Sequence, residues 1–504
     1  MNDTKRNIIL IGAFERDNLG DILFSKIFKK LLNDYVVINS SLLSNDLTSI
    51  GGDRTLSISL LRNKNTSPIA VIYCGGETLL CNKIDALRMD MNPVFYKKNL
   101  PGLELSINNI IKAIFPAIDT FGYVFSRQEL NIKKEVPIGG YFSVGGSNED
   151  ILKKNKSLAI KLKNKLDDAK CIFVRDNNSK KNLIKYAAIT ASVYPDLVTI
   201  ISHFYKKEIN KILRLDNFFK NNKQNSYLVF QVNKKYIEDN GVSAISNILI
   251  KIFRMIKKTI VLQPMGIANF HDSIEMFNKI VMDIKNKSPF TKIIVQKDRD
   301  IWKQVSVLSN SYINIGTSLH LRIISTSYAN HVISLENNKV TNYLKTWGRD
   351  KQPFNVKLRD LEGAIYECFS IDQSTLNNTR DYFIKKTLSG LKILCKNLNL
   401  KINFKLQDFD INDSNICYYY DILSSELSKN RELLIEKIKE LNIIKNSRNH
   451  NPAPINNREI ETIKKELSLK NTENQNLEKS LNQIKSAKFF KLWQGYCKIR
   501  DKFF

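Results

Sequence analysis

The 504-residue sequence has no uninterrupted apolar run long enough to cross a lipid bilayer. Its first residues, MNDTKRNIILIG, lead straight into a strand pattern and lack the apolar core and small-residue cleavage site of a signal peptide. We therefore expect a cytoplasmic protein. A peripheral location at the inner face of the cell membrane is expected only through the C-terminal segment described below.

Paired cysteine motifs are also missing. The seven cysteines are scattered, none forms a CxxC pair, and their number is odd. Reduced and mostly buried thiols are the simplest interpretation. Cys74 and Cys81 flank a turn, but the neighbouring sequence supplies too few further ligands for a metal site. The sequence thus predicts no metal and no tightly bound cofactor.

Acidic residues are outnumbered by basic ones, 50 against 78, which gives a formal net charge of +28. A basic protein attracts polyanions such as nucleic acid, anionic lipid or acidic glycan. The chain nevertheless has no zinc-ligand spacing, no RNP-type aromatic box and no other signature of a nucleic-acid module. Because lysine recurs throughout, much of it is ordinary surface, and we predict no nucleic-acid binding.

Two series of apolar runs alternate with helical patterns. The first predicts strands at 7–12, 35–39, 69–74 and 171–174, and helices at 21–32 and 179–188. After a charged stretch near 204–226, the second predicts strands at 227–232, 259–263 and 292–296, and helices near 243–257 and 272–285. Such alternation is typical of βαβ units and parallel sheets.

The two series predict an α/β fold with two Rossmann-like domains that face a cleft, followed by a helical C-terminal extension. The expected domains span 1–210 and 225–375, and the extension spans 376–504. In sheets of this kind, ligands bind beyond the carboxyl ends of the strands. The glycine turns at 12, 75–76 and 316 all fall at such ends.

The segment Gly316-Thr317-Ser318-Leu319-His320-Leu321-Arg322 lies between apolar runs at 312–315 and 332–335. The pattern predicts a strand, a glycine turn, a helix and a strand. It places His320 near a helix N-terminus, where unpaired N–H groups and the helix dipole favour an anion. Histidine titrates near neutral pH, which suits acid–base work on a phosphorylated substrate. The alternative is a histidine that caps or packs in an ordinary α/β turn.

Three further segments lie at strand ends in the first series. Residues 12–21 close in the sequence N-L-G-D, Gly75-Gly76 follows a buried strand, and Val174-Arg175-Asp176 precedes Ser179 and Tyr194-Pro195-Asp196. Together with the Ser318-Leu319-His320 turn, their order and spacing resemble the polysaccharide pyruvyl transferase family over roughly residues 7–350.

This resemblance implies a GT-B-like architecture and transfer of pyruvate from phosphoenolpyruvate to a sugar hydroxyl, with release of phosphate and formation of a ketal. It implies phosphoenolpyruvate as co-substrate and a glycan or lipid-linked glycan, a surface-polysaccharide precursor, as acceptor. Two other hypotheses stay open because fold does not determine function. One is a GT-B glycosyltransferase with a nucleotide-sugar donor, and the other is a non-catalytic scaffold of glycan assembly.

His320 is the candidate catalytic residue under this resemblance. The candidates for donor binding are Arg175, Arg322, Ser318, Lys339 and Gly316. Guanidinium forks bind carboxylate or phosphate bidentately, although an ion pair between Arg175 and Asp176 is an equal alternative. Many family members have an arginine two residues before the histidine, where this chain has Ser318. Arg322, two residues after, is a substitute that a helix would place on a different face.

The candidates for loops that face the cleft are Asn18, Gly20, Asp21, Gly75, Gly76 and Glu77. Glycine permits a close approach of the backbone to a ligand. Asp21 is also explained as a helix cap, and Glu77 as an exposed helix start. Asp196, after Pro195, is interpreted as a turn residue.

The extension contains two notable patterns. Residues 460–484 carry a short heptad-like series, which predicts either self-association or a single helix packed on the core. Residues 488–504 combine aromatic residues with lysine and arginine. That composition suits an amphipathic helix on an anionic membrane surface, or a docking helix for a partner protein.

Overall fold

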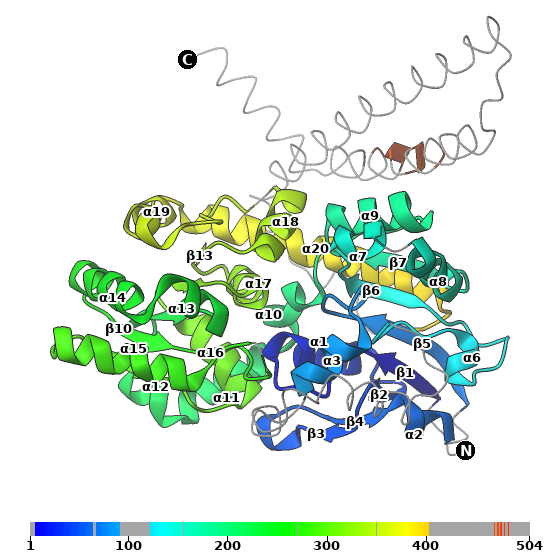
Figure 1. Cartoon of the computed structure of the whole chain (residues 1–504), viewed down its shortest axis with the longest axis horizontal. Coiled ribbons are helices and arrows are strands. Elements are labelled where there is room, and N and C mark those ends of the chain that lie inside the picture. Colours follow the sequence, from blue (N-terminus) through cyan, green and yellow to red (C-terminus); the bar gives the residue numbers. More distant parts are fainter. Residues whose placement is uncertain are drawn as a thin grey trace, which may run out of the picture. The chain divides into compact units, whose positions relative to one another are not determined.

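The computed structural model describes residues 6–63, 67–90, 121–154, 156–269, 271–348 and 350–402, together with seven residues between 468 and 482 (Figure 1). Residues 1–404 form one compact unit and 405–504 a second. The seven described residues of the second unit are helical. Residues 488–504 and most of 460–484 lie outside the described residues. Membrane binding, partner docking and self-association through these segments therefore stay predictions.

The first half contributes eight strands to one sheet, in the order β3-β4-β2-β1-β5-β6-β7-β8. The strands are β1 (Asn7–Ile11), β2 (Val36–Ser41), β3 (Asn45–Asp46), β4 (Arg54–Ser57), β5 (Pro68–Cys74), β6 (Gly140–Val144), β7 (Cys171–Val174) and β8 (Ser192–Val193). All neighbours pair in parallel except β3 and β4. The helices are α1 (Leu19–Leu31), α2 (Ile58–Asn63), α3 (Lys83–Asp90), α6 (Arg127–Leu130), α7 (Glu149–Lys154), α8 (Lys156–Leu166) and α9 (Asn177–Ala187).

The second half has a five-stranded parallel sheet in the order β11-β10-β9-β12-β13. The strands are β9 (Tyr227–Gln231), β10 (Thr259–Leu262), β11 (Ile293–Val295), β12 (Asn314–Gly316) and β13 (Val332–Ser334). The helices are α13 (Lys234–Asn240), α14 (Val242–Ile256), α15 (Ile274–Lys287), α16 (Ile301–Asn310), α17 (Leu319–Ser327), α18 (Asn338–Trp347) and α19 (Leu361–Phe369). The predicted α/β fold with two parallel sheets is confirmed.

The charged stretch between the two series is helical. The 3₁₀ turn Leu197–Ile200 leads into α10 (Ile201–Phe204), α11 (Lys206–Leu215) and α12 (Asn217–Asn221). Each sheet has its own apolar core, one centred on residues such as Val71 and Val144, the other on residues such as Phe230 and Ile315. Among the described residues, no helix has both the length and the apolar character that a bilayer span requires.

The boundary expected at 376 falls inside a helix of the first compact unit. Helix α20 (Gln373–Asn397) begins beside the second sheet and packs on the first, where it contacts β6 and β7. Thr387 and Thr199 share a hydrogen bond of 2.7 Å between their hydroxyl oxygens, and Leu394 and Leu398 lie against Gly140. An apolar stripe shows that a helix is half-buried, but it does not reveal which sheet the helix covers.

Two junctions bring the carboxyl ends of the sheets together. In the first, the Leu19 N–H donates to the Met265 carbonyl at 2.8 Å, and the Ile267 N–H donates to the Asp17 carbonyl at 3.0 Å. Asp17 also pairs with Arg299 through both carboxylate oxygens. The loops that follow β1 and β10 are thereby joined, as expected for a ligand site at the carboxyl ends of two facing sheets.

The second junction uses α18. The Asp196 N–H donates to the Tyr343 hydroxyl at 3.3 Å, and the indole N–H of Trp347 donates to the Arg175 carbonyl at 3.1 Å. Both acceptor and donor groups are buried. Because an unpaired buried polar group costs free energy, these bonds hold α18 against the loops that follow β7 and β8.

Candidate active site

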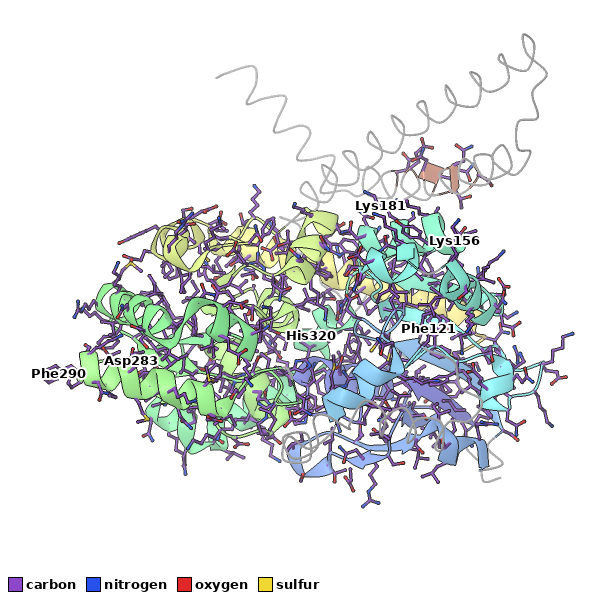
Figure 2. The ribbon with its side chains drawn as sticks, viewed as in Figure 1. Phe121, Lys156, Lys181, Asp283, Phe290 and His320 are labelled. Carbon is purple, nitrogen blue, oxygen red and sulfur yellow. The ribbon has the colours of Figure 1, made fainter. Side chains whose placement is uncertain are left out.

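His320 lies inward where the two halves meet, whereas a residue such as Phe290 projects from the surface (Figure 2). It is the second residue of α17, and 8% of its surface is exposed. Ser318 is the N-cap, and its hydroxyl oxygen accepts from the Leu321 N–H at 3.3 Å. Ser318, predicted to bind the donor, thus caps the helix that carries the histidine, as serine commonly does.

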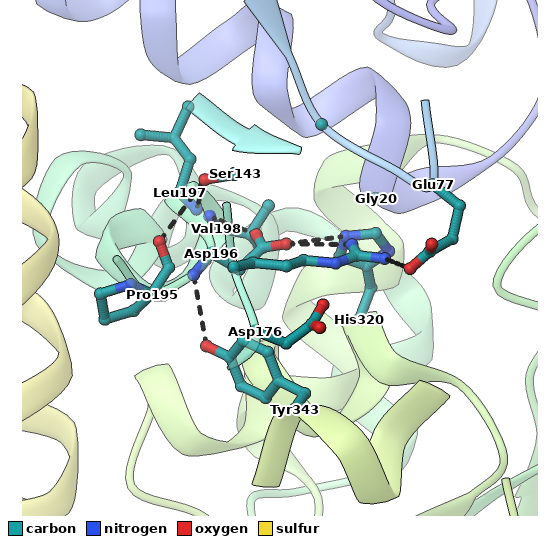
Figure 3. Close-up of polar contacts among 12 residues, drawn as sticks. Gly20, Glu77, Ser143, Asp176, Pro195, Asp196, Leu197, Val198, His320 and Tyr343 are labelled. Carbon is teal, nitrogen blue, oxygen red and sulfur yellow. Dashed lines mark hydrogen bonds and ion pairs between the residues drawn. The ribbon is translucent and has the colours of Figure 1, made fainter. Parts of the chain in front are cut away.

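Asp196 lies beside the imidazole (Figure 3). The Asp196 Oδ2 atom is 3.7 Å from His320 Nε2, and Asp196 is completely buried. Burial opposes ionisation of this carboxyl, but His320 and Arg175 outweigh it and lower the pKa of Asp196. Its other oxygen accepts from the Val198 N–H at 3.0 Å, which fixes the orientation of the carboxylate.

The interpretation of Asp196 as a turn residue was therefore incomplete. It caps the 3₁₀ turn at 197–200 and also faces His320 and Arg175. Its signal in the sequence was the Y-P-D tripeptide, which ends one of the four strand-end segments. A local pattern shows the cap but not the histidine 124 positions further along, because that contact depends on how the two sheets face each other.

Gly20 forms the surface on which the imidazole lies. A Cβ atom at position 20 would lie 1.8 Å from His320 Nδ1, so only glycine leaves room for the ring. The Gly20 N–H donates to Asn18 Oδ1 at 3.2 Å, which makes Asn18 the N-cap of α1. Asp21 is therefore not the N-cap but an acidic residue in the first turn of α1, a position that the helix dipole favours. Phe24, one turn along α1, contacts the imidazole edge-on with ring centroids 5.7 Å apart.

The glycine pair after β5 approaches protein rather than open space. Gly75 and Gly76 have φ angles of +77° and +65°, a backbone conformation that residues with a side chain rarely adopt. A Cβ on Gly75 would lie 2.4 Å from a ring carbon of Phe24. A Cβ on Gly76 would lie 3.3 Å from Asp21 Oδ1. The close approach expected of these glycines therefore serves to pack the start of α1 against the end of β5.

Arg175 sits between two carboxylates. Its guanidinium is 2.7 Å from Glu77 Oε1 and 3.5 Å from Asp196 Oδ2, and its side chain is almost completely buried. Desolvation opposes its charge, but Glu77 and Asp196 raise the pKa of Arg175 above its usual value. Asp176, the alternative partner, instead caps α9 by accepting from the Ser179 N–H at 2.7 Å.

Glu77 does not start a helix, so that alternative is wrong. Besides Arg175, its carboxylate accepts from the Ser147 N–H at 3.2 Å. Burial opposes ionisation of Glu77, but Arg175 and Lys339 outweigh it and hold the pKa of this carboxyl at about 2. Lys339 itself is exposed, yet the surrounding protein desolvates its ammonium, and this desolvation, reinforced by Arg175, lowers the pKa of Lys339.

A second histidine belongs to the same surroundings. Burial lowers the pKa of His271 to about 4; Asp21 opposes this shift, while Arg16 and Lys339 add to it. His271 is therefore neutral at physiological pH. Arg16 is held by the Met89 sulfur at 2.8 Å and by the Tyr123 hydroxyl. The sequence interpretation gave Arg16 no role, although it stands in the loop that ends in N-L-G-D.

Arg322, predicted to bind the donor, is engaged in contacts within the protein. Its guanidinium makes two contacts with Asp350, at 2.8 and 2.9 Å, and is fully buried. It also donates to the carbonyls of Val332, Pro353 and Gln352. All N–H groups of the guanidinium are therefore hydrogen-bonded within the protein. The helix turns position 322 away from the face that carries His320.

Gly316, also predicted to contact the donor, is required by packing. A Cβ at this position would lie 2.6 Å from the Gln231 carbonyl oxygen. Gln231, at the end of β9, was not identified from the sequence. It contacts the turn before α17 and is treated below.

The assembled site has the His320 imidazole backed by the Asp196 carboxylate, the Lys339 ammonium and the buried Arg175 guanidinium. Such a set supports proton transfer beside a bound anion. Among the residues described, no group of three His, Cys, Asp or Glu side chains is placed to hold a metal ion.

Comparison with known proteins supplies the family. Comparison with solved structures finds UDP-GlcNAc 2-epimerase from Neisseria meningitidis bound to UDP-GlcNAc, with 12% identity, coverage of 79% of this chain and 100% of that one, and a TM-score of 0.47. The UDP-GlcNAc 2-epimerase of Methanocaldococcus jannaschii has 15% identity, coverage of 78% and 100%, and a TM-score of 0.47. A UDP-forming α,α-trehalose-phosphate synthase from Burkholderia xenovorans has 10% identity, coverage of 78% and 100%, and a TM-score of 0.43.

No curated protein matches the chain. The model of the family described as polysaccharide pyruvyl transferase matches residues 18–339. This range begins at the Asn18 cap and ends at Lys339, and it includes Asp196, His320 and the junctions that join the two sheets. The resemblance noted from the strand-end segments is confirmed, and the chain belongs to the polysaccharide pyruvyl transferase family.

Proposed function

We propose that the protein transfers pyruvate from phosphoenolpyruvate to a sugar hydroxyl of a surface-polysaccharide precursor and forms a ketal. The observation that carries this proposal is the His320–Asp196 pair beside Lys339 and Arg175, in a chain of the pyruvyl transferase family. Phosphoenolpyruvate carries a carboxylate and a phosphate, so its binding requires cations and N–H donors.

Lys339 is the cation best placed for the donor. Lys339 is exposed as a residue, while Arg175 is buried behind Glu77 and Asp196. We assign donor contact to Lys339. We assign to Arg175 the orientation of the two carboxylates, and its direct contact with the donor stays a prediction. The N-terminus of α17, next to His320, adds a helix dipole that favours the anionic groups of the donor.

The proton chemistry falls to His320. The protonated imidazole gives its proton to the methylene carbon of the enol ester, the acceptor hydroxyl oxygen bonds to the neighbouring carbon, and its proton passes to the imidazole that has become neutral. The bond between that carbon and the phosphate oxygen then breaks, and a second hydroxyl closes the ketal as its proton passes to the leaving phosphate. Asp196 stabilises the positive imidazole, as a carboxylate does for a histidine that acts as general acid.

The test is an NMR analysis of surface glycans from cells that carry the natural protein, His320→Ala or His331→Ala. His331 is a matched control, because it lies beside Phe369 and Cys368 rather than Asp196. We expect the methyl signal of a pyruvate ketal in the natural and His331→Ala strains and its loss in His320→Ala. Loss of a sugar residue without any ketal supports the glycosyltransferase hypothesis, and identical glycans support the scaffold hypothesis.

The acceptor class and the tail extend this proposal. A lipid-linked glycan acceptor would be presented at a membrane surface, and the aromatic and basic composition of residues 488–504 suits anionic lipid. We therefore propose a peripheral location at the inner face of the membrane, with residues 460–484 available for self-association.

A further inference from the structure

Gln231 uses both ends of its side-chain amide at the carboxyl end of β9. Its Oε1 atom accepts from the N–H of Thr317 at 3.1 Å and from the N–H of Ser318 at 2.9 Å. Its Nε2 atom donates to Asp272 Oδ1 at 2.8 Å. Both side chains are buried. Gln231 thus ties the turn immediately before His320 to a buried carboxylate.

Asp272 connects that turn to the opposite wall of the site. Its second oxygen, Oδ2, accepts from the Met265 N–H at 2.7 Å, and its own N–H donates to the Gly266 carbonyl at 3.0 Å. Met265 and Gly266 are the residues that pair with Leu19 and Asn18. The next residue, Gly20, is the surface on which the imidazole lies.

We infer that Asp272 and Gln231 are positioning residues that hold His320 from two sides, through the turn that starts α17 and through the loop that carries Gly20. This inference rests on the proposed function for its catalytic consequence, but the network itself is independent of the reaction. Neither residue touches the imidazole, so both act through the backbone segments that they bind.

The network requires two acceptor oxygens at position 272. An asparagine there would turn its NH₂ group toward either the Gln231 amide or the Met265 N–H, and donor would face donor. Gln231 cannot rotate to relieve this, because its oxygen already accepts from two N–H groups. Protonation of Asp272 weakens the same network, because a carboxylic acid accepts hydrogen bonds less strongly than a carboxylate does.

Opposing effects act on the ionisation of the Asp272 carboxyl. Burial raises the pKa of this carboxyl to about 7, against the opposing effects of the Met265 N–H, Gln231 and Arg299. Arg299 is itself paired with Asp17 from the loop before α1, and His271, the preceding residue, is neutral. Because the folded pKa exceeds the usual 3.8, the protonated form stabilises the fold, and this contribution is lost as pH rises through about 7. Positioning of His320 depends on the ionised form. As pH rises toward 7, the stabilisation by Asp272 therefore decreases while the positioning of His320 improves.

Three variants test the inference. Asp272→Asn should lower kcat by about 10²-fold with little change in KM, because a displacement of about 1 Å at the reacting group has that effect. Gln231→Glu places two carboxylates 2.8 Å apart, where they share one proton. That shared proton restores the link to Asp272, so Gln231→Glu should retain activity at acidic pH and lose it as pH rises.

Asn314→Ala is the matched control. Asn314 is buried at the opposite end of β12 and donates to the Leu308 carbonyl at 3.0 Å. Its loss removes buried hydrogen bonds from the same strand without touching the turn before His320. We expect lower stability in urea unfolding but unchanged kcat and an unchanged pH profile.

A readout that does not depend on activity is the NMR signal of the His320 imidazole, which is assigned by its disappearance in His320→Ala. Asp272→Asn and Gln231→Glu should shift this signal, and Asn314→Ala should not. If both site variants lower stability but leave the signal and the pH profile unchanged, the inference is overturned. If the natural protein forms no ketal, the proposed function fails, while the imidazole signal still tests the network.

Discussion

Gly20→Ala is expected to displace His320, the proposed catalytic histidine. The added Cβ would lie 1.8 Å from His320 Nδ1 and 2.2 Å from two ring carbons. Ordinary van der Waals contact begins at 3.4 Å, so the imidazole must retreat by about 1.5 Å. The ring contacts Phe24 and lies beside Asp196, so a retreat from Gly20 disturbs its position against the carboxylate.

The magnitude follows from two opposing effects. Alanine is more favourable than glycine in a helix by about 0.5–1 kcal/mol, and the φ angle of Gly20 is not in the left-handed region. Overpacking against a buried ring costs about 1–3 kcal/mol. The net expectation is a loss of about 1–2 kcal/mol in the free energy of unfolding. Displacement of the imidazole should lower kcat by about 10²-fold.

The assay combines urea unfolding with ketal formation in a double-mutant cycle. In the His320→Ala background the ring is gone, so Gly20→Ala should increase stability by about 0.5–1 kcal/mol. Gly363 is the matched control, because it also lies in the first turn of a helix, α19, but has open space where a Cβ would be placed. Gly363→Ala should stabilise the protein and leave kcat unchanged.

The reasoning is refuted by a specific outcome of the cycle. If Gly20→Ala destabilises the protein equally with and without the His320 ring, the two residues are not in contact. If kcat is unchanged in Gly20→Ala, the position of the imidazole against α1 is not required for catalysis.

Two further predictions concern buried charges. Arg322→Met should lower the free energy of unfolding by about 3–5 kcal/mol, because it leaves Asp350 buried without its partner. The KM for phosphoenolpyruvate should stay unchanged, and a raised KM at unchanged stability would show that Arg322 binds the donor. For Glu77→Gln, the folded pKa of about 2 lies below the usual 4.5, so the stabilising effect of the carboxylate is complete above pH 4.5 and is lost as pH falls toward 2. The difference in urea stability between the natural protein and Glu77→Gln should narrow over that range, and a difference that persists at pH 2 would contradict the ion pair with Arg175.

The position of the site was largely predictable from the sequence. Strand-end segments such as Gly75-Gly76 and the His320 turn were identified because strands and helices have distinct periodicities and because parallel sheets bind ligands at their carboxyl ends. Lys339 lies near Glu77 and Asp196, and Asp196 lies beside His320. The ion pair between Arg322 and Asp350 was not predicted, because Asp350 follows in the chain only after β13 and α18.

The sequence by itself determined the two α/β series, the family and the turns that carry the chemistry, because these depend on local periodicity and on short motifs. Only the tertiary structure decided which groups act together. Asp196 meets His320, Glu77 meets Arg175, and Gln231 joins Asp272 to the turn before α17. Each contact crosses between distant strands or between the two halves. Its existence therefore depends on how the sheets face each other and how α18 and α20 return to the first half, which no local pattern of residues encodes.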